Sequence, residues 1–411
     1  MRKVLIVGAG QSGLQLGLGL QARGYEVTLV SNRTAEEIRC GRVMSTQCMF
    51  DGALALERAQ ELDLWASEAP RIEGLGISVS APDARRAIDW VGKLEGYAQS
   101  VDQRLKMSRF LDLFEERGGR LVIENATVED LDRLAPEYDL MLIAAGKGDL
   151  VSLFERDASR SPYSAPQRSL AVAYAHGVAP RPEHDFPAVR CNLVPGGGEL
   201  FVIPCLTLSG PCHTLFWEAI PGGPLDVFGG ITDPDEHFER TLELMKRFTP
   251  WEYERAKHAE LTDANATLSG RFAPTVRRPI AVLPSGTLVL GVADVVVVND
   301  PITGQGSNNA AKCAALYLDS IVSHGDRPFD RDFMQGAFER FWESVAPVTK
   351  WTNAMLAPPP EHVLGLIAAG ARSPEVANRF ANAFDDPSDF EEWFFDPERA
   401  AAYLSRVAPS A

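Results

Sequence analysis

Short apolar runs and a glycine-rich turn open the chain. Residues 4–7 are an unbroken apolar run, residues 8–13 read Gly-Ala-Gly-Gln-Ser-Gly, and residues 14–23 carry leucines at helical spacing before Gly24. A further apolar run occupies residues 27–30. Short apolar runs bounded by turn residues are typical of buried strands, and a glycine after a periodic segment marks the end of a helix. The pattern predicts a strand, a helix and a second strand in a βαβ unit.

The same reading extends along the chain and predicts an α/β protein. The remaining predicted elements of this kind are helices at residues 107–117 and 308–323 and strands at residues 121–123, 140–144 and 288–292. Between residues 168 and 231, short β-rich stretches alternate with Gly/Pro turns, which is typical of an antiparallel sheet. From residue 331 onward the sequence is mostly amphipathic helix.

These elements predict three regions. A chain of 411 residues, 45% of them apolar, is long enough to bury more than one core. The predicted regions are a discontinuous nucleotide-binding domain at residues 1–165 and 270–325, an antiparallel-sheet lobe at residues 166–269 with parts of 60–100, and a helical C-terminal region at residues 326–411.

The net charge and the cysteine pattern limit the binding partners and the compartment that we expect. The formal net charge of −16 repels a phosphate backbone and an anionic membrane face, so neither nucleic acid nor a membrane is an expected partner. No apolar window approaches the roughly 20 residues of a membrane span. Six cysteines without a CxxC pair predict free thiols and a cytoplasmic protein. The seven histidines never pair at short spacing, so no metal site is expected.

The first glycine turn matches the GxGxxG pattern of dinucleotide-binding folds. In this pattern Gly8 makes the tight turn, Gly10 lets a pyrophosphate approach the backbone, and Gly13 lets the helix pack on the strand. Gln11 and Ser12 open the helix, whose N-terminus faces the phosphates. A strand before the glycines and a helix after them make this match specific.

The end of the second predicted strand departs from that pattern. An acidic residue is expected there, about 20 positions after the glycines. Ser31, Asn32 and Arg33 occupy this place instead. Because Arg33 could bind a phosphate or stack on adenine, the departure keeps NADP open as a ligand.

A second signal favours a flavin over a nicotinamide. Asp294 follows a predicted strand that ends near Gly291, and a carboxylate at a strand end can bind ribityl or ribose hydroxyls. Residues 300–309 read Asp-Pro-Ile-Thr-Gly-Gln-Gly-Ser-Asn-Asn before a predicted helix. A glycine-rich loop at a helix N-terminus directs amides and a positive dipole toward an anion. Reduced flavin, which carries negative charge at its pyrimidine edge, is such an anion.

Together these motifs resemble the FAD-dependent monooxygenases of the p-hydroxybenzoate hydroxylase-like fold. Residues 101–105 (VDQRL), the 300–309 loop and residues 350–353 (KWTN) resemble more closely the oxygenase component of styrene and indole monooxygenases. The similarity extends from residue 1 to near the C-terminus, although the family's Gly-Asp pair is interrupted here between Gly291 and Asp294. The resemblance implies a Rossmann-like FAD-binding domain, an antiparallel-sheet substrate lobe and a helical C-terminus.

The resemblance also implies a two-component system. FAD would arrive as FADH2 from a transient NAD(P)H:flavin reductase partner, and O2 would be the co-substrate. The sequence agrees with this, because it has one dinucleotide turn and no second one for a nicotinamide. A homodimer is left open. The cofactor-binding residues implied are Gly8, Gly10, Gln11, Ser12, Gly13, Ser31, Asn32, Arg33, Arg42, Arg104, Val128, Ala145, Gly146, Asp294, Pro301, Gly304, Gln305, Gly306, Ser307, Asn308 and Asn309.

The substrate implied by the resemblance is a small aromatic alkene. Residues matching Ser45, Gln47 and Met49 differ between styrene- and indole-preferring members, and the set found here is similar to the indole branch. An amide or a hydroxyl can hydrogen-bond an indole N–H or the flavin edge. We therefore expect epoxidation of indole at C2=C3, which leads to indoxyl and indigo, with styrene and sulfides as further substrates. The implied catalytic residues are Ser45, Gln47, Met49 and Pro301, and the implied substrate-binding residues are Met44, Ile77, Ala98 and Phe216.

Four alternatives stay open on sequence grounds. They are a styrene-preferring epoxidase, a single-component NAD(P)H-dependent aromatic hydroxylase, a flavin-dependent halogenase and a non-enzymatic binding protein on the same fold. A halogenase should carry a W-x-W-x-I-P stretch, and no Trp here has another Trp two residues on. The glycines of the 300–309 loop argue against a protein that binds no flavin.

Overall fold

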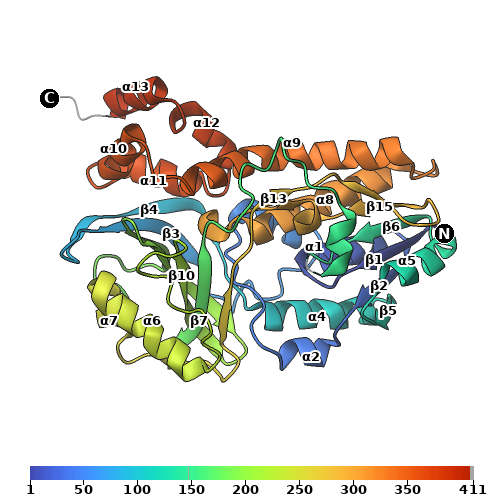
Figure 1. The fold of residues 1–411 in the computed structure, drawn as a ribbon, viewed down its shortest axis with the longest axis horizontal. Coiled ribbons are helices and arrows are strands. Elements are labelled where there is room, and N and C mark those ends of the chain that lie inside the picture. Colours follow the sequence, from blue (N-terminus) through green and yellow to red (C-terminus); the bar gives the residue numbers. More distant parts are fainter. Residues whose placement is uncertain (147, 408–411) are drawn as a thin grey trace.

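Two large β-sheets organise the chain, and helices cover both of them (Figure 1). The computed structural model describes residues 1–146 and 148–407. A six-stranded sheet contains the N-terminal strand, and a larger sheet is formed mainly by the middle of the sequence. A two-stranded pair, β13 (Thr275–Val276) with β16 (Val297–Val298), completes the described sheets.

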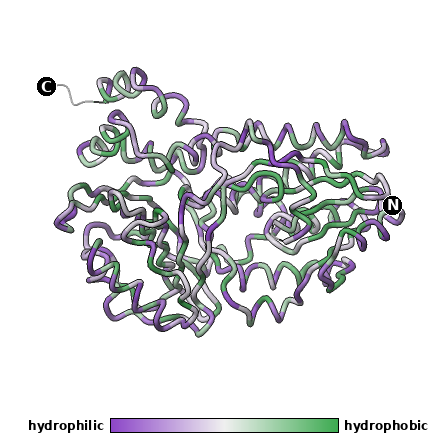
Figure 2. The backbone as a smooth tube through the Cα atoms, in the orientation of Figure 1, coloured by the Kyte–Doolittle hydropathy of each residue, from purple (hydrophilic) through white to green (hydrophobic). Residues whose placement is uncertain are grey.

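The six-stranded sheet contains the predicted βαβ unit. Its order is β14 (Ile280–Val282), β15 (Leu288–Gly291), β6 (Leu140–Ile143), β1 (Lys3–Val7), β2 (Glu26–Ser31) and β5 (Arg120–Ile123). All neighbours pair in parallel except β14, which is antiparallel to β15. Figure 2 shows its central strands as largely hydrophobic, as expected for a sheet buried on both faces.

Three helices pack around this sheet and bury its core. They are α1 (Gln11–Gln21), α4 (Gln103–Glu116) and α8 (Gly306–His324). Leu14 and Leu16 of α1 are fully buried, and Tyr317 of α8 donates a hydrogen bond to the Gly291 carbonyl at 3.0 Å. Shorter helices connect the strands: α2 (Ala35–Arg39), α3 (Asp51–Arg58), α5 (Val128–Leu134), η1 (Ala135–Glu137) and η2 (Asp149–Leu153).

The larger sheet has two apolar faces. Its order is β11 (Glu260–Leu261), β7 (Ser169–His176), β10 (Gly210–Ala219), β9 (Gly198–Thr207), β8 (Ala188–Val194), β3 (Ile72–Ser80) and β4 (Arg86–Ala98), with β12 (Thr267–Gly270) also paired to β7. Because side chains alternate along a strand, Trp217 faces one side of the sheet and Phe216 the other. Helices α6 (Pro234–Phe248) and α7 (Pro250–Ala256) cover the Trp217 side.

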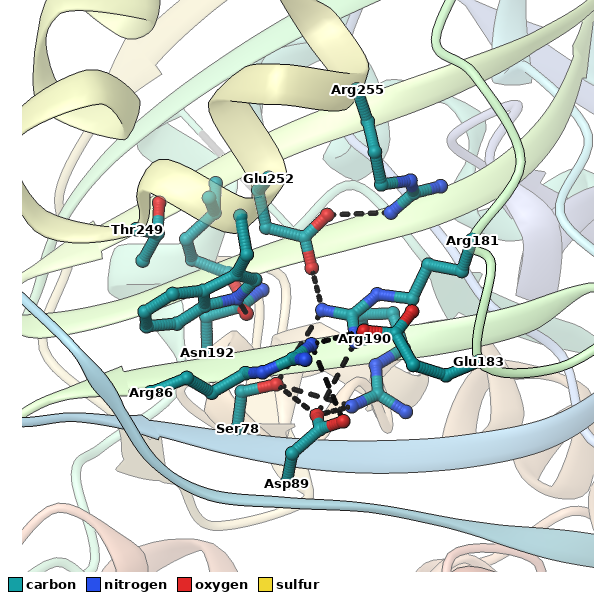
Figure 3. A network of polar contacts seen from close by, with 12 residues as sticks. Ser78, Arg86, Asp89, Arg181, Glu183, Arg190, Asn192, Thr249, Glu252 and Arg255 are labelled. Carbon is teal, nitrogen blue, oxygen red and sulfur yellow. Dashed lines mark hydrogen bonds and ion pairs between the residues drawn. The ribbon is translucent and has the colours of Figure 1, made fainter.

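An ion-pair network fixes α7 on this sheet (Figure 3). Arg181 bonds Glu252 of α7, and Glu252 also pairs with Arg255. Arg190 of β8 pairs with Asp89 of β4 and donates to the Trp90 carbonyl at 3.0 Å. Each buried guanidinium therefore has a carboxylate partner, as buried charges require.

The C-terminal region from residue 331 onward is helical and lies against the Phe216 side of the larger sheet and against α8. It contains α9 (Arg331–Met355), α10 (Glu361–Gly370), α11 (Pro374–Asn382), η5 (Pro387–Asp389), α12 (Phe390–Trp393) and α13 (Pro397–Val407). An aromatic cluster holds these helices together, with the Trp351 and Phe384 rings 4.7 Å apart and the Trp351 and Phe390 rings 4.6 Å apart.

The predicted elements are found close to their expected positions. The strand, turn and helix at the N-terminus, the antiparallel sheet in the middle and the helical C-terminus are confirmed. Strands β3 and β4 join the middle sheet across a long gap in sequence, because β3 pairs in parallel with β8. Within residues 1–146 and 148–407, no helix is both long and apolar enough to cross a bilayer.

Candidate functional site

Five segments meet at one edge of the six-stranded sheet. Because β1, β2, β5, β6 and β15 run parallel, their carboxyl ends share that edge. The segments that follow these strands carry many of the predicted cofactor residues: Gly8 to Gly13, Ser31 to Arg33, Val128, Ala145 with Gly146, and Asp294. The carboxyl edge of a parallel sheet is where α/β proteins bind ligands.

The first glycine turn is shaped by close backbone contacts. A Cβ on Gly13 would lie 2.1 Å from the Gly8 carbonyl oxygen, so α1 and β1 can approach this closely only with glycine there. A Cβ on Gly8 would lie 2.6 Å from the Ala145 nitrogen, which presses the turn against the end of β6. Gly10 differs, because a Cβ there meets no heavy atom within 4 Å. The turn is tight on its inner side and open at Gly10.

The loop at residues 300–306 makes a second open turn. Gly304 has a φ of 64°, a left-handed conformation that favours glycine, and it leads directly into α8. A Cβ on Gly304 or Gly306 meets no heavy atom within 4 Å. The first turn of α8 has no acidic residue and no side-chain cap. Its backbone N–H groups therefore remain available to an anion.

Side chains of this loop tie it to the rest of the molecule. Gln305 donates to the Phe384 carbonyl at 2.8 Å, and the Thr303 and Thr352 hydroxyls are 2.6 Å apart. Asn308 donates to the Cys48 carbonyl at 2.9 Å. The Oε1 of Gln305 has no hydrogen-bond partner although it is buried, and the same holds for the Oδ1 of Asn309. These two buried oxygens are hydrogen-bond acceptors that a ligand bound beside the open turn can use.

Asp294 and Gly146 lie close together at the sheet edge. Asp294 lies in η3 (Ala293–Val295), directly after β15, and its side chain is exposed. A Cβ on Gly146 would lie 3.0 Å from the Asp294 Cβ. Of the two residues that interrupt the family's Gly-Asp pair, Val292 is the N-cap of this short 3-10 helix and Ala293 begins it, with a φ of 48°. Asp294 therefore reaches the sheet edge despite the insertion.

Other predicted cofactor residues are distributed more widely. The Arg33 guanidinium contacts the Met44 sulfur, with Nη2 and Sδ 2.7 Å apart, and Asn32 is exposed. Arg42 is exposed, and its charge helps to lower the pKa of His237 in α6, which burial lowers most. Val128 begins α5 after β5, at the edge of the sheet.

Arg104 lies inside the protein, where it joins the two sheets. It is 1% exposed and forms ion pairs with Asp102 at 2.7 Å and with Asp263 at 2.8 Å. Its Nη2 also donates to the Thr207 hydroxyl at 3.5 Å. The guanidinium is thus bound by two carboxylates, and its predicted contact with the flavin stays a prediction.

Residues 44–49 lie in the connection between α2 and α3, which has no helix or strand apart from an isolated bridge at Met49. Met49 pairs with Gln99 through two backbone hydrogen bonds, of 2.8 and 2.9 Å. Ser45 is exposed, and its carbonyl accepts a hydrogen bond from the Tyr174 hydroxyl at 3.3 Å. Gln47 is buried, its Nε2 donates to the Val101 carbonyl, and its Oε1 has no partner. Gln47 therefore holds one unused hydrogen-bond acceptor inside the protein.

The structure divides the predicted substrate residues between two clusters. Ile77, Ala98 and Phe216 belong to the apolar cluster on one face of the larger sheet, together with Cys48. Gln47 and Met49, on either side of Cys48 in the sequence, lie outside this cluster. They line a cavity of about 10 Å³ that also contacts Trp65, Lys106 and Glu57. That volume is about the room of one water molecule.

Sequence analysis missed a buried ion pair below the glycine turn. Glu57 of α3 and Lys106 of α4 are each 2% exposed, and their charged groups are in contact. Gln11 donates to the same Glu57 oxygen at 2.8 Å, and Lys106 donates to the Met49 sulfur at 3.1 Å. The sequence offered one signal for this pair, which was a charged residue at a helix position where the pattern expects an apolar one. A charged residue at such a position is rarely buried without a partner.

A separate cavity of about 780 Å³ lies elsewhere in the larger sheet. Its lining includes Arg181, Arg190, His213 and Arg255, and burial lowers the pKa of His213 to about 4. It shares no lining residue with the predicted site. In the described part of the chain, no group of three or more His, Cys, Asp and Glu side chains is placed to hold a metal ion.

Comparisons with known sequences point to one family. Residues 146–255 match a family model described as "Styrene monooxygenase A putative substrate binding domain". Two curated relatives are both named styrene monooxygenase StyA, one from Pseudomonas fluorescens and one from a Pseudomonas species. Each is 31% identical to this chain, and each alignment covers 100% of this chain and 99% of the relative.

Comparisons with solved structures show the fold. A flavoprotein/dehydrogenase from Cytophaga hutchinsonii has a TM-score of 0.69 at 10% identity, with 98% of this chain and 99% of that chain covered. The flavin-dependent brominase Bmp2 has a TM-score of 0.67 at 13% identity, with 98% of both chains covered. The p-nitrophenol 4-monooxygenase PnpA from Pseudomonas putida has a TM-score of 0.63 at 12% identity, with 94% and 99% covered. These neighbours confirm the predicted p-hydroxybenzoate hydroxylase-like fold.

Proposed function

This chain belongs to the styrene monooxygenase family, and from that membership we propose that it is the oxygenase component of a two-component system. Membership in this family implies a flavin cofactor and O2 as co-substrate. The proposed cofactor is FAD, received as FADH2 from an NAD(P)H:flavin reductase. The proposed reaction is epoxidation of indole at C2=C3. The supporting observation is the open space at Gly10, Gly304 and Gly306 beside two helix N-termini.

The residues at the sheet edge fit a flavin dinucleotide. We assign the pyrophosphate to the open turn at Gly10 and the start of α1, where no side chain caps the first backbone N–H groups. Asp294 would bind a ribityl or ribose hydroxyl. The anionic pyrimidine edge of the reduced ring would face the uncapped N-terminus of α8 after Gly306. In this proposal residues 1–165 and 270–325 are the FAD-binding domain, and residues 166–269 contribute the substrate lobe.

In the proposed reaction, the chain's own task is to orient the flavin and the substrate and to enclose them. A bound reduced flavin supplies the electrons that activate O2 for transfer to a carbon–carbon double bond. The bonds from Thr303 to Thr352 and from Gln305 to Phe384 fix the 300–306 loop against the C-terminal helices. Pro301 would close the flavin side of the pocket. An apolar enclosure excludes water from the reacting atoms.

NADH or NADPH alone should leave FAD oxidised in the presence of this chain. The sequence has one dinucleotide turn, so a nicotinamide has no site of that type from which to deliver hydride. Anaerobic stopped-flow absorbance of the flavin measures this directly. Chemically reduced FAD plus air is the positive control and should yield product from indole. Rapid bleaching by NADPH alone would instead favour a single-component aromatic hydroxylase.

Gln47→Val should reduce the preference for indole over styrene. The unpartnered Oε1 of Gln47 is the proposed acceptor for the indole N–H. Losing one buried hydrogen bond costs about 1–3 kcal/mol, and flavin binding should change little. The measurement is product formation from mixed indole and styrene, with indigo as the visible product of indole. Since the space beside Gln47 is small, binding requires a neighbour such as Trp65 to move.

The matched control is Gln335→Val, which makes the same substitution at an exposed position of α9. It should leave the preference unchanged. An unaltered preference in Gln47→Val would remove the indole assignment while leaving the flavin-dependent oxygenase in place. A styrene-preferring epoxidase is the second candidate, because the curated relatives are named for styrene. Wild-type protein that oxidises styrene far faster than indole would support it.

A further inference from the structure

Four ionisable side chains gather on the Phe216 side of the larger sheet. Glu199 of β9 and Glu218 of β10 are directly paired across the two strands. Each lies two residues from an aromatic residue on the same side of the sheet, Phe201 and Phe216, whose ring centroids are 6.2 Å apart. The cluster also contains Arg168, just before β7, and Asp300, which begins the 300–306 loop. We call these four residues the carboxyl cluster.

The carboxyl cluster has more acids than its one arginine can pair. Arg168 holds Glu199 in a two-pronged ion pair, with Nε to Oε2 at 2.8 Å and Nη2 to Oε1 at 3.0 Å. Glu218 is 0% exposed, and neither of its carboxyl oxygens has a hydrogen-bond partner. Asp300 is 2% exposed, and its Oδ1 accepts from the Ile302 N–H at 3.2 Å. Glu218 and Asp300 are left without a cation of their own.

This arrangement keeps a proton inside the protein. Burial, reinforced by the charges of Asp300 and Glu199, raises the pKa of Glu218 well above its ordinary value, against the opposing charge of Arg168. Burial also raises the pKa of Asp300 to about 6. From β8, Cys191 faces the cluster as a neutral thiol, since burial and both glutamates raise its pKa. The protonated form of Glu218 is therefore favoured, and Asp300 is the group with a pKa of about 6.

We propose that Glu218 and Asp300 form a buried proton store for the oxygenation site, which rests on the function proposed above. The reaction consumes one proton: anionic reduced flavin, O2, an alkene and H⁺ give oxidised flavin, epoxide and water. The Asp300 O–H bond breaks, its proton goes to the oxygen atom that leaves as water, and a proton from solvent returns to the Asp300 carboxylate. Glu218 keeps its own proton and so adds no negative charge beside Asp300. Asp300 begins the loop that would face the flavin. Two like charges at that place are costly, so binding of the anionic flavin draws a proton onto Asp300.

Infrared spectroscopy of the flavin-free chain tests the store directly. The wild type should show a C=O band of a buried protonated carboxyl that shifts in D2O, and Glu218→Gln should remove it. A second carboxyl band should titrate near pH 6 and disappear in Asp300→Asn, where the asparagine can still cap the loop. A wild-type spectrum unchanged by Glu218→Gln would overturn the proposal. Asp330→Asn, at the exposed N-cap of α9, is the matched control.

Binding of reduced FAD without O2 tests the coupling to the flavin. Above pH 6 the wild-type Kd should rise by up to about tenfold per pH unit relative to Asp300→Asn, because one proton is taken up with the ligand. Comparing the two chains cancels the ionisation of the free flavin. If log Kd changes equally with pH in the wild type and in Asp300→Asn, the proton coupling is overturned. If neither chain binds FAD, the proposed function fails and the coupling with it, whereas the infrared result still decides whether Glu218 holds a proton.

Discussion

Gly10→Ala should leave the chain folded and weaken flavin binding by about 100-fold. Gly10 has a φ of −91° and a ψ of −174°, an extended conformation that alanine adopts freely, and an added Cβ meets no heavy atom within 4 Å. The methyl group would occupy the space assigned to the pyrophosphate. Losing charged hydrogen bonds from the backbone N–H groups costs about 1.5–3 kcal/mol each, which makes a loss of this size reasonable. Equilibrium titration with FADH2 measures it.

Gly336→Ala supplies the control for this experiment. Gly336 is exposed in α9, and a Cβ there also meets nothing within 4 Å. Alanine favours a helix by up to about 1 kcal/mol, so this variant should be as stable as the wild type or slightly more stable. Its flavin affinity should be unchanged. Wild-type affinity in Gly10→Ala would mean that the pyrophosphate does not lie at this turn.

Lys106→Met should destabilise the chain by about 3–5 kcal/mol, because it leaves the Glu57 charge buried without its partner. Glu57 is 2% exposed, and Gln11 is the only other side chain whose hydrogen bond to it the structure records among the described residues. The measurement is the free energy of unfolding from urea denaturation. Adding Glu57→Gln to Lys106→Met should recover much of the loss, because the double variant buries no unpaired charge.

A second ion pair on α4 provides the comparison. Arg109 and Glu116 are 2.8 Å apart, but their side chains are 39% and 56% exposed. Exposed pairs contribute about 0–1 kcal/mol, so Arg109→Met should cost no more than that. A loss in Lys106→Met as small as that in Arg109→Met would contradict the role given to the buried pair.

The sequence by itself determined the local elements and the family. The run at residues 4–7, the glycines at 8, 10 and 13 and the leucines of α1 specify a strand, a turn and a helix, because each depends on neighbours within a few residues. The 300–306 loop was recognisable for the same reason. The resemblance built on these motifs agrees with relatives that are 31% identical along the whole chain.

Only the tertiary structure decided which distant residues meet. Strand β3 joins β8 across more than a hundred residues, and no local pattern encodes that pairing. Gln47 lies outside the cluster that contains Phe216, although the sequence suggests one pocket. Glu57 contacts Lys106 only after α3 and α4 have packed together. Glu218 lies opposite Glu199 only after β9 and β10 have paired. The energy of a buried charge depends on what surrounds it in space, and that environment exists only once the chain has folded.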